Sequence, residues 1–283
     1  MRIDLHSHSS ASDGTEKPAE VVRRAGVAGL DVLALTDHDT VAGVAAAAAA
    51  LQAGLTLVPG MELSCRRDGM SVHMLAYLFD ADEPALAAEC ARIRRAREER
   101  GRQMVQRLAD LGVPLSWEQV CALADGGVVG RPHIARAMVA AGAISEPAEA
   151  FTTEWIAPGG RAYVSRYALD PVAAVRLVNV AGGASVLAHP KADKRGRTVP
   201  DAWIAELADA GLFGVEADHR DHDAGSRDQV RKLAAELGLA TTGASDDHGE
   251  LTGHRLGCET TSPEVYERLL AATTGRAPIT GDR

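Results

Sequence analysis

The sequence predicts an α/β barrel that is interrupted by an all-helical insertion. Three observations support this fold class. Short β-rich runs alternate with helical patterns through the first eighty residues, the strand signal disappears from about 83 to 162, and the alternation then resumes. Repeated βα order implies parallel strands. We therefore expect residues 1–82 and 163–283 to form the barrel and residues 83–162 to form the insertion.

The first segment contains four β-rich runs, at residues 3–8, 32–36, 56–58 leading into 61–64, and 72–78. Ala-rich helical patterns at 17–26 and 41–54 separate the first three, and glycine closes each of them, which is typical of a helix C-terminus. Alanine is the best helix former, so the run 45–50 predicts helix rather than low complexity.

The insertion is predicted to begin with one long amphipathic helix over residues 89–111. Its apolar stripe consists of Ile93, Met104, Val105, Leu108 and Leu111. Shorter helices follow at about 117–124, 131–141 and 147–155, separated by Gly- or Pro-containing breaks. The long helix is rich in arginine, but glutamates are interleaved with the arginines, so we favour a solvated helix over an RNA-binding surface. Aromatic residues make up only 4% of the chain.

The last segment resumes the alternation. Helical patterns cover about 171–181, 203–210, 227–237 and 263–273, and β-rich runs cover 184–189, 212–217 and 240–245. The whole chain thus offers around seven strands, one fewer than the eight of a TIM barrel.

Composition sets limits on the class of protein. A chain of 283 residues with 46% hydrophobic residues buries a sizeable core. It lacks a run of about 18 apolar residues, and no basic flank or apolar signal core precedes His6, so we expect a cytoplasmic protein without a membrane partner. The four cysteines form no C-x-x-C pair, which argues against a zinc ribbon and a disulfide framework.

Histidines and acids gather where the predicted strands end. His6 and His8 lie two apart on a strand and therefore point the same way. The C-terminal ends of barrel strands form the catalytic rim. The residues at or near these ends are Asp13, Asp37, His38, Asp39, Glu62, His73, His189, Asp246, Asp247 and His248.

Each of these residues alone has a structural explanation. Asp13-Gly14 is a good turn, Asp37 or Asp39 is suited to cap a helix, and His189 before Pro190 is suited to end a strand through a hydrogen bond. Together they are not explained in this way, because burying unpaired polar groups at strand after strand costs several kcal/mol. A metal centre accounts for all of them. Three divalent ions would also change the net charge from −9 to −3.

These motifs resemble those of the PHP family, named for polymerase and histidinol phosphatase. The resemblance implies a distorted (β/α)7 TIM-like barrel that binds two or three divalent ions. It implies a first ion on His6, His8, Glu62 and Asp246, a second on Glu62, His73 and His189, and a third on Asp13, His38 and His248. Some relatives carry histidine where this chain has Asp13. Imidazole and carboxylate ligands suit Mn, Zn or Fe; we expect Mn, with Zn or Fe as alternatives.

A narrower resemblance lies in the insertion. Gly130-Arg131-Pro132-His133-Ile134-Ala135 is similar to a PHP subfamily that dephosphorylates nucleoside 3′,5′-bisphosphates, some members of which trim short RNA from the 5′ end. Arg131 offers a planar fork suited to a second phosphate, with a solvated helix start as the alternative. The loop residues His133, Lys191, His219 and His222 are further candidates for substrate binding.

The expected activity is hydrolysis of a phosphate ester by a hydroxide that two or three ions activate. The preferred substrate is a small nucleotide, a nucleoside 3′,5′-bisphosphate such as adenosine 3′,5′-bisphosphate, converted to the 5′-monophosphate. Asp37 is expected to orient a ligand or transfer a proton, with a structural cap as an equal alternative. The alternatives are 5′-3′ exoribonuclease activity on short RNA, histidinol-phosphate phosphatase activity, and a non-catalytic accessory metal-binding domain. No obligate protein partner is evident.

Overall fold

The computed structural model describes residues 1–281, apart from the side chain of Arg195. Seven strands follow one another around a nearly closed barrel in the order β1 to β7. The short strand β8 pairs with the first two residues of β3. Their bounds are Ile3–Asp4, Val32–Leu35, Thr56–Arg67, Met70–Tyr77, Ala184–Leu187, Gly214–Asp218, Ala240–Gly243 and Ile279–Thr280 for β1 to β8.

The helices divide between the barrel and the insertion. Barrel helices are α1 (Pro18–Val27), α2 (Val44–Ala49), α6 (Pro171–Val180), α7 (Asp201–Asp209), α8 (Ala224–Leu237) and α9 (Pro263–Ala272), with the 3₁₀ turns η2 (Asp193–Arg195) and η3 (Gly249–Thr252). The insertion contains α3 (Pro84–Asp110), α4 (Trp117–Ala124), α5 (Arg131–Ala140) and the 3₁₀ turn η1 (Pro147–Phe151). Proline stands in the first turn of many of these helices, where its fixed φ favours the helix and its missing N–H costs nothing.

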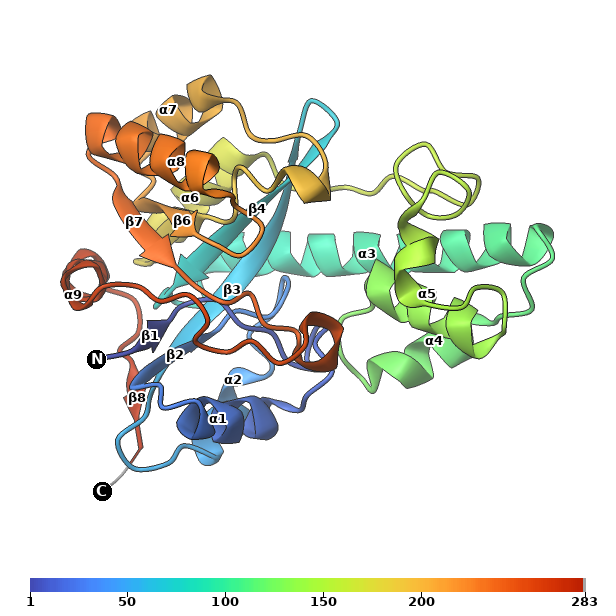
Figure 1. The fold of residues 1–283 in the computed structure, drawn as a ribbon, viewed down its shortest axis with the longest axis horizontal. Helices are drawn as coiled ribbons and strands as arrows, with labels where there is room; N and C mark the ends of the chain where they lie inside the picture. Colours follow the sequence, from blue (N-terminus) through green and yellow to red (C-terminus); the bar gives the residue numbers. More distant parts are fainter. Residues whose placement is uncertain (282–283) are drawn as a thin grey trace.

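The insertion has a hydrophobic cluster of its own. Buried residues between 104 and 164 pack together, with Met104, Leu108, Ile134 and Met138 at or below 1% exposure. Figure 1 shows α3 running from beside the barrel strands into a lobe that α4 and α5 complete. The first half of α3 belongs to the barrel, because Leu86, Cys90 and Ile93 pack with β3 and β4. Helix α3 thus contributes residues to both hydrophobic clusters.

The prediction that β4 is parallel to its neighbours is wrong. β3 and β4 form an antiparallel hairpin with Arg67 opposite Met70, and β4 is also antiparallel to β5. The turn consists of Asp68 and Gly69, both at positive φ, which is the conformation that two-residue hairpins require. A parallel connection needs a dozen or more residues, and two cannot provide it.

The barrel closes through the residues that follow β1 and β7 rather than through a regular ladder. Within residues 1–281, β1 and β7 share no strand pairing; instead Ser7 bridges Asp247, and the Asp246 N–H donates to the His6 carbonyl over 2.9 Å. The buried Asp4 carboxylate accepts hydrogen bonds from the N–H groups of Ser245 and Gly257. The first and last barrel strands are therefore held together at the rim that carries the predicted ligands.

Candidate metal centre

Glu62 lies at the middle of a cluster of histidines. Its side chain is 1% exposed, and its two oxygens face different rings. Oε2 lies 3.3 Å from His6 Nε2, 3.1 Å from His8 Nε2 and 3.2 Å from His38 Nδ1. Oε1 lies 2.8 Å from His73 Nδ1 and 3.3 Å from His189 Nε2. A carboxylate placed in this way is able to contact two neighbouring ions at once.

The residues expected to hold the first ion lie together. Ligand atoms of His6, His8, Glu62 and Asp246 are all within 4.8 Å of one another. Asp246 Oδ1 is 3.3 Å from the Nε2 atoms of both His6 and His8, and these two nitrogens are 3.1 Å apart. Two imidazole nitrogens and two carboxylate oxygens facing one point form a ligand set suited to a divalent ion.

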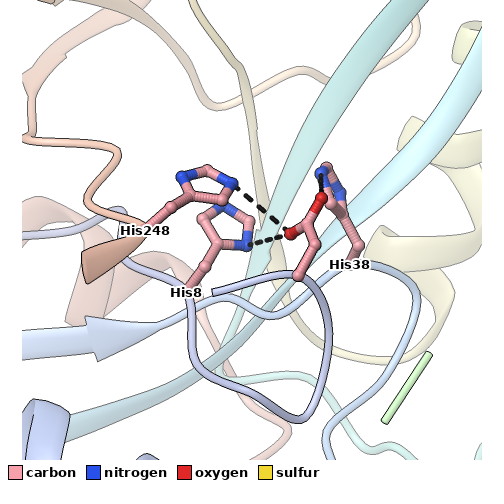
Figure 2. Close-up of side chains that lie close together, drawn as sticks. His8, His38 and His248 are labelled. Carbon is pink, nitrogen blue, oxygen red and sulfur yellow. Dashed lines mark ion pairs between the residues drawn. The ribbon is translucent and has the colours of Figure 1, made fainter. Parts of the chain in front are cut away.

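The residues expected at the third ion surround Asp13. Figure 2 shows His8, His38 and His248 around one carboxylate. The atoms of Asp13 lie 3.9 Å from His8 Nδ1, 3.8 Å from His38 Nε2 and 3.4 Å from His248 Nε2. These four residues form one ligand group, so His8 adds to the expected three.

The residues expected at the second ion are arranged slightly differently. His73 groups with Glu62 and with His38, rather than with His189, while His189 Nε2 still reaches Glu62 Oε1. His73 lies early in β4, opposite Ser64. Because the hairpin turns β4 back, the start of β4 is next to the end of β3, and His73 reaches the same rim from an antiparallel strand.

The donor set fits a bound cation. The Nδ1 atoms of His8, His38 and His73 are buried and make no hydrogen bond within residues 1–281; the approach of His73 Nδ1 to Glu62 lacks hydrogen-bond geometry. Burial alone would lower the pKa of His8, yet Asp246 and Glu62 raise it to about 10, which shows how strongly this point attracts positive charge. Burial would raise the pKa of Glu62, but the surrounding histidines hold it well below its usual value. The attraction of positive charge at His8 and the ionised state of Glu62 both fit bound divalent ions.

Backbone strain is concentrated among these residues. Asp39, His189 and Asp246 have φ values of 57°, 30° and 50°, in the left-handed region that costs a non-glycine residue energy. Each has a backbone N–H that donates within the site: Asp39 to the Glu62 carbonyl, His189 to Glu216, and Asp246 to the His6 carbonyl. The tertiary structure holds these strained conformations in place.

Asp37 braces a loop instead of facing the ligand cluster. Its Oδ1 accepts from Ser9 N and Ser12 Oγ, and its Oδ2 accepts from Ser9 Oγ, at 2.7 to 2.8 Å. Burial raises its pKa. The loop it braces connects His8 to Asp13, so Asp37 supports two ligands through the backbone that carries them.

Three of the residues expected to bind substrate have contacts within the protein instead. His133 is buried and its Nδ1 accepts from Gly130 N at the start of α5. Lys191 Nζ donates to the Val199 carbonyl and to Asp201, and its N–H donates to His222 Nε2. His222 Nδ1 donates to the Ala217 carbonyl. These bonds fasten loops, so we leave His133, Lys191 and His222 out of the proposed substrate site.

His219 lies beside the metal-ligand cluster. It is fully buried, its Nδ1 accepts from Asp221 N, and its Nε2 is therefore the protonated nitrogen, 3.4 Å from Asp246 Oδ2. Arg255 approaches the same Oδ2 at 3.6 Å. His219 and Arg255 thus contact Oδ2 of Asp246, while its Oδ1 faces His6 and His8.

Arg131 lines a small cavity that adjoins the ligand cluster. The cavity has a volume of about 230 Å³, and Asp13, His38 and His73 form one side of it. Five arginines also line this cavity: Arg66, Arg97, Arg100, Arg131 and Arg166. Only Arg131 of this set was expected as a ligand. Arg97 and Arg100 are three apart on α3, a spacing that places them on one helix face, but the interleaved glutamates obscured this signal.

Among the described residues, Arg100, Arg131 and Arg166 make no ion pair with a carboxylate. Burial and the charges of neighbouring arginines together lower the pKa of Arg166 to about 9, and burial also lowers the pKa of Arg100 and Arg131. Arg100 Nε is buried without a hydrogen-bond partner in the described chain. Such a group of unneutralised guanidinium ions is suited to bind an anion.

A second, larger cavity also borders His73. It has a volume of about 650 Å³ and includes His189, Pro190 and the exposed Lys194 and Arg197. Arg131, His73 and Phe151 line both cavities. Phe151 is 41% exposed, and the Arg131 guanidinium lies 5.5 Å from the centre of its ring.

A barrel whose rim carries clustered imidazoles and carboxylates beside an arginine-lined cavity defines a metal-dependent phosphoesterase. Comparison with known proteins agrees: residues 4–147 match the PHP domain family, and the chain belongs to this family. It is 36% identical to a 3′,5′-nucleoside bisphosphate phosphatase of Chromobacterium violaceum, over 89% of each chain. It is 34% identical to a 5′-3′ exoribonuclease of Haemophilus influenzae, over 87% of this chain and 90% of that one.

The fold comparison agrees with the sequence comparison. A solved structure from Bifidobacterium adolescentis, provisionally named a metal-dependent phosphoesterase, superposes with a TM-score of 0.89 at 32% identity and covers 96% of both chains. No helix within residues 1–281 has the length and apolar character needed to cross a membrane.

Proposed function

We propose that the protein removes one phosphate from a nucleoside 3′,5′-bisphosphate, leaving the 5′-monophosphate. The observation that carries this proposal is the arginine-lined cavity beside the ligand cluster. A substrate with two phosphates occupies both places: its scissile phosphate lies at the ligand cluster and its second phosphate among the arginines. The relative from C. violaceum, with its bisphosphate activity, supports the same substrate class.

The residues have separate tasks in this reaction. Divalent ions, for which we propose Mn, supply an activated water and offset charge on the phosphate oxygens when they are bound. His6, His8, Glu62 and Asp246 would hold one ion, and the groups around Asp13 and His73 would hold others. The arginines hold the second phosphate and so place the scissile phosphate at the ligand cluster, and this orientation lowers the entropic cost of reaching the transition state.

The alternative substrates fit the site less well. Histidinol phosphate has one phosphate, so its binding would leave the half-buried Arg100, Arg131 and Arg166 without an anion, at a cost in free energy. A non-catalytic metal-binding domain would not explain why the ligand cluster lies beside an arginine-lined cavity.

Short 5′-phosphorylated RNA is a second candidate substrate, and one observation favours it. The larger cavity continues from His73 and His189 to the exposed Lys194 and Arg197, which provide cations for a further phosphate. A 5′-phosphate among the arginines and a scissile phosphodiester at the ligand cluster would direct the rest of the chain into this cavity. The H. influenzae exoribonuclease supports this candidate.

A phosphate-release screen with Mn-loaded protein tests the proposed function. The substrates are adenosine 3′,5′-bisphosphate, 3′-AMP, 5′-AMP, histidinol phosphate and 5′-phosphorylated RNA of three to six nucleotides. We expect adenosine 3′,5′-bisphosphate to give the highest kcat/KM. A preference for 3′-AMP or histidinol phosphate would contradict the proposal, because these substrates have no second phosphate for the arginines.

The RNA candidate has its own test. Release of nucleoside 5′-monophosphates from short RNA, reduced in a Lys194→Ala/Arg197→Ala variant that still hydrolyses the bisphosphate, would support it. Intact RNA after prolonged incubation with a fully active enzyme would reject it.

A further inference from the structure

Glu216 is a buried carboxylate that the sequence analysis did not single out. It lies in β6 and has no exposed surface. Its Oε1 is 3.2 Å from His6 Nδ1, and its Oε2 accepts a hydrogen bond of 2.8 Å from the backbone N–H of His189. His6 and His189 belong to different parts of the ligand cluster. One carboxylate therefore contacts a residue on each side of Glu62.

The contact with His6 determines which ring nitrogen is available. His6 Nε2 faces Glu62 and Asp246, each at 3.3 Å, so Nε2 is the atom that would bind an ion. A neutral imidazole carries its proton on one nitrogen only, and an ionised carboxylate accepts that proton's hydrogen bond. Glu216 therefore keeps the proton on Nδ1 and leaves the lone pair of Nε2 directed into the cluster.

The contact with His189 holds a strained backbone. His189 has a φ of 30°, in the left-handed region that is strained for a non-glycine residue. Its N–H points at Glu216 Oε2 in this conformation. The same conformation brings His189 Nε2 to 3.3 Å from Glu62 Oε1. Without this acceptor, a buried N–H would lose its partner and the strained conformation would lose its support.

We propose that Glu216 is a positioning residue that presets one histidine in each of two neighbouring ion sites, so that it supports both ions without touching either. The two oxygens act on different groups, an imidazole N–H and a backbone N–H. Both contacts need an acceptor. A single carboxylate side chain meets this requirement, and an amide does not.

Glu216→Gln is the informative substitution because it keeps the size of the side chain. An amide has one acceptor oxygen and one NH₂ group. Whichever way the amide is oriented, its NH₂ faces one of the two N–H donors, so either His6 or His189 loses its acceptor. Glu216→Asp is the second variant: it keeps the charge but withdraws the carboxylate by one methylene. The matched control is Glu259→Gln, whose carboxylate pairs with Arg227 and, among the described residues, makes no hydrogen bond or ion pair with a histidine.

The experiment measures metal binding rather than activity. Metal-free protein is titrated with Mn by calorimetry, metal content is counted after gel filtration, and the melting temperature of each metal-free variant is recorded. We expect Glu216→Gln to bind Mn about 10–100-fold more weakly, the usual cost of losing an outer partner of a metal ligand. Glu216→Asp should also bind more weakly, and Glu259→Gln should bind like the wild type.

A ring ¹⁵N spectrum of Zn-loaded protein gives a second readout, because a metal-bound imidazole is neutral and Zn, unlike Mn, is diamagnetic. The wild type should show His6 protonated on Nδ1, and Glu216→Gln should show a changed tautomer mixture. Wild-type Mn affinity and an unchanged His6 tautomer in a folded Glu216→Gln variant would overturn the proposal. Should Glu216→Gln fail to fold, a folded Glu216→Asp variant with wild-type Mn affinity would overturn it equally. Because no substrate is present, the result is independent of which phosphate ester the protein hydrolyses.

Discussion

Arg97 Nε donates to Asp39 Oδ2 over 2.6 Å, in a pair that is almost fully buried. Arg97 belongs to α3, and Asp39 immediately follows the ligand His38. Asp39 Oδ1 accepts from Ser64 N, two residues after Glu62. Burial alone would raise the pKa of Asp39, yet Arg97 lowers it below its usual value. The insertion is thus bonded to the backbone that carries two ligands.

Replacing Arg97 by Met should destabilise the protein by about 3–5 kcal/mol, because it leaves the buried Asp39 carboxylate without its cation. Urea denaturation measures the change in the free energy of unfolding. Arg102→Met, on the exposed side of the same helix, is the control and should have little effect. The double variant Arg97→Met/Asp39→Asn should recover part of the loss. An Arg97→Met protein as stable as Arg102→Met would contradict the assignment.

The arginine-lined cavity should bind inorganic phosphate and raise the melting temperature. Burial and mutual repulsion lower the pKa values of Arg100 and Arg166, which means that their charged forms destabilise the folded chain until an anion arrives. A ligand at 100 times its Kd adds about 2.7 kcal/mol of stability. We expect metal-free protein to show this shift in differential scanning fluorimetry and Arg166→Met to lose most of it. An equal shift in both proteins would place the phosphate elsewhere.

Phe151 should bind the nucleobase by stacking. It is an exposed aromatic side chain at the junction of the two cavities. Stacking of a base on an aromatic ring contributes about 1–3 kcal/mol, so Phe151→Ala should raise KM for adenosine 3′,5′-bisphosphate by roughly ten-fold. KM for the abasic analogue, in which hydrogen replaces the base, should stay unchanged.

Leu251→Ala is the matched control for Phe151→Ala, since Leu251 is similarly exposed but lines a different cavity. A rise in KM that is equal for the nucleotide and its abasic analogue would show that Phe151 does not contact the base.

Removing the ions should destabilise the protein. Chelation leaves Glu62, Asp13 and Asp246 without the cations that their arrangement attracts, so the melting temperature should fall and Mn should restore it. Metal analysis should find at least two ions per chain in the wild type. His6→Ala and Asp246→Ala should each lower this number, and Asp228→Ala, at an exposed side chain of α8, should not. Unchanged metal content in both ligand variants would overturn the site.

Many residues of the ligand cluster could be predicted because they follow one rule of barrel topology. Barrel strands end at the same rim, so polar residues at successive strand ends meet even when they are far apart in the sequence. This rule places His6, Glu62, His189 and Asp246 together. It also applies to Glu216, but this acid stands inside the β-rich run 212–217 and was not among the predicted site residues.

Other features depend on tertiary structure that no local pattern specifies. Arg100 and Arg166 come together only because α3 passes the segment that leads into α6. Helix α2 covers only Val44–Ala49, within the expected 41–54, because alanine favours helix without marking its ends. The β3–β4 hairpin, by contrast, had a visible signal in Asp68-Gly69, which the prediction of uniform βα alternation overlooked.

The most direct test of the account is the ratio of kcat/KM for adenosine 3′,5′-bisphosphate to that for 3′-AMP, measured in the Mn-loaded wild type and in Arg166→Met. Hydrogen bonds to charged groups contribute about 1.5–3 kcal/mol, so the wild-type ratio should be at least about ten. In Arg166→Met the ratio should fall towards one, while kcat/KM for 3′-AMP stays near that of the wild type. A wild-type ratio near one, or a ratio that Arg166→Met leaves unchanged, would contradict anchoring of the second phosphate by the arginines.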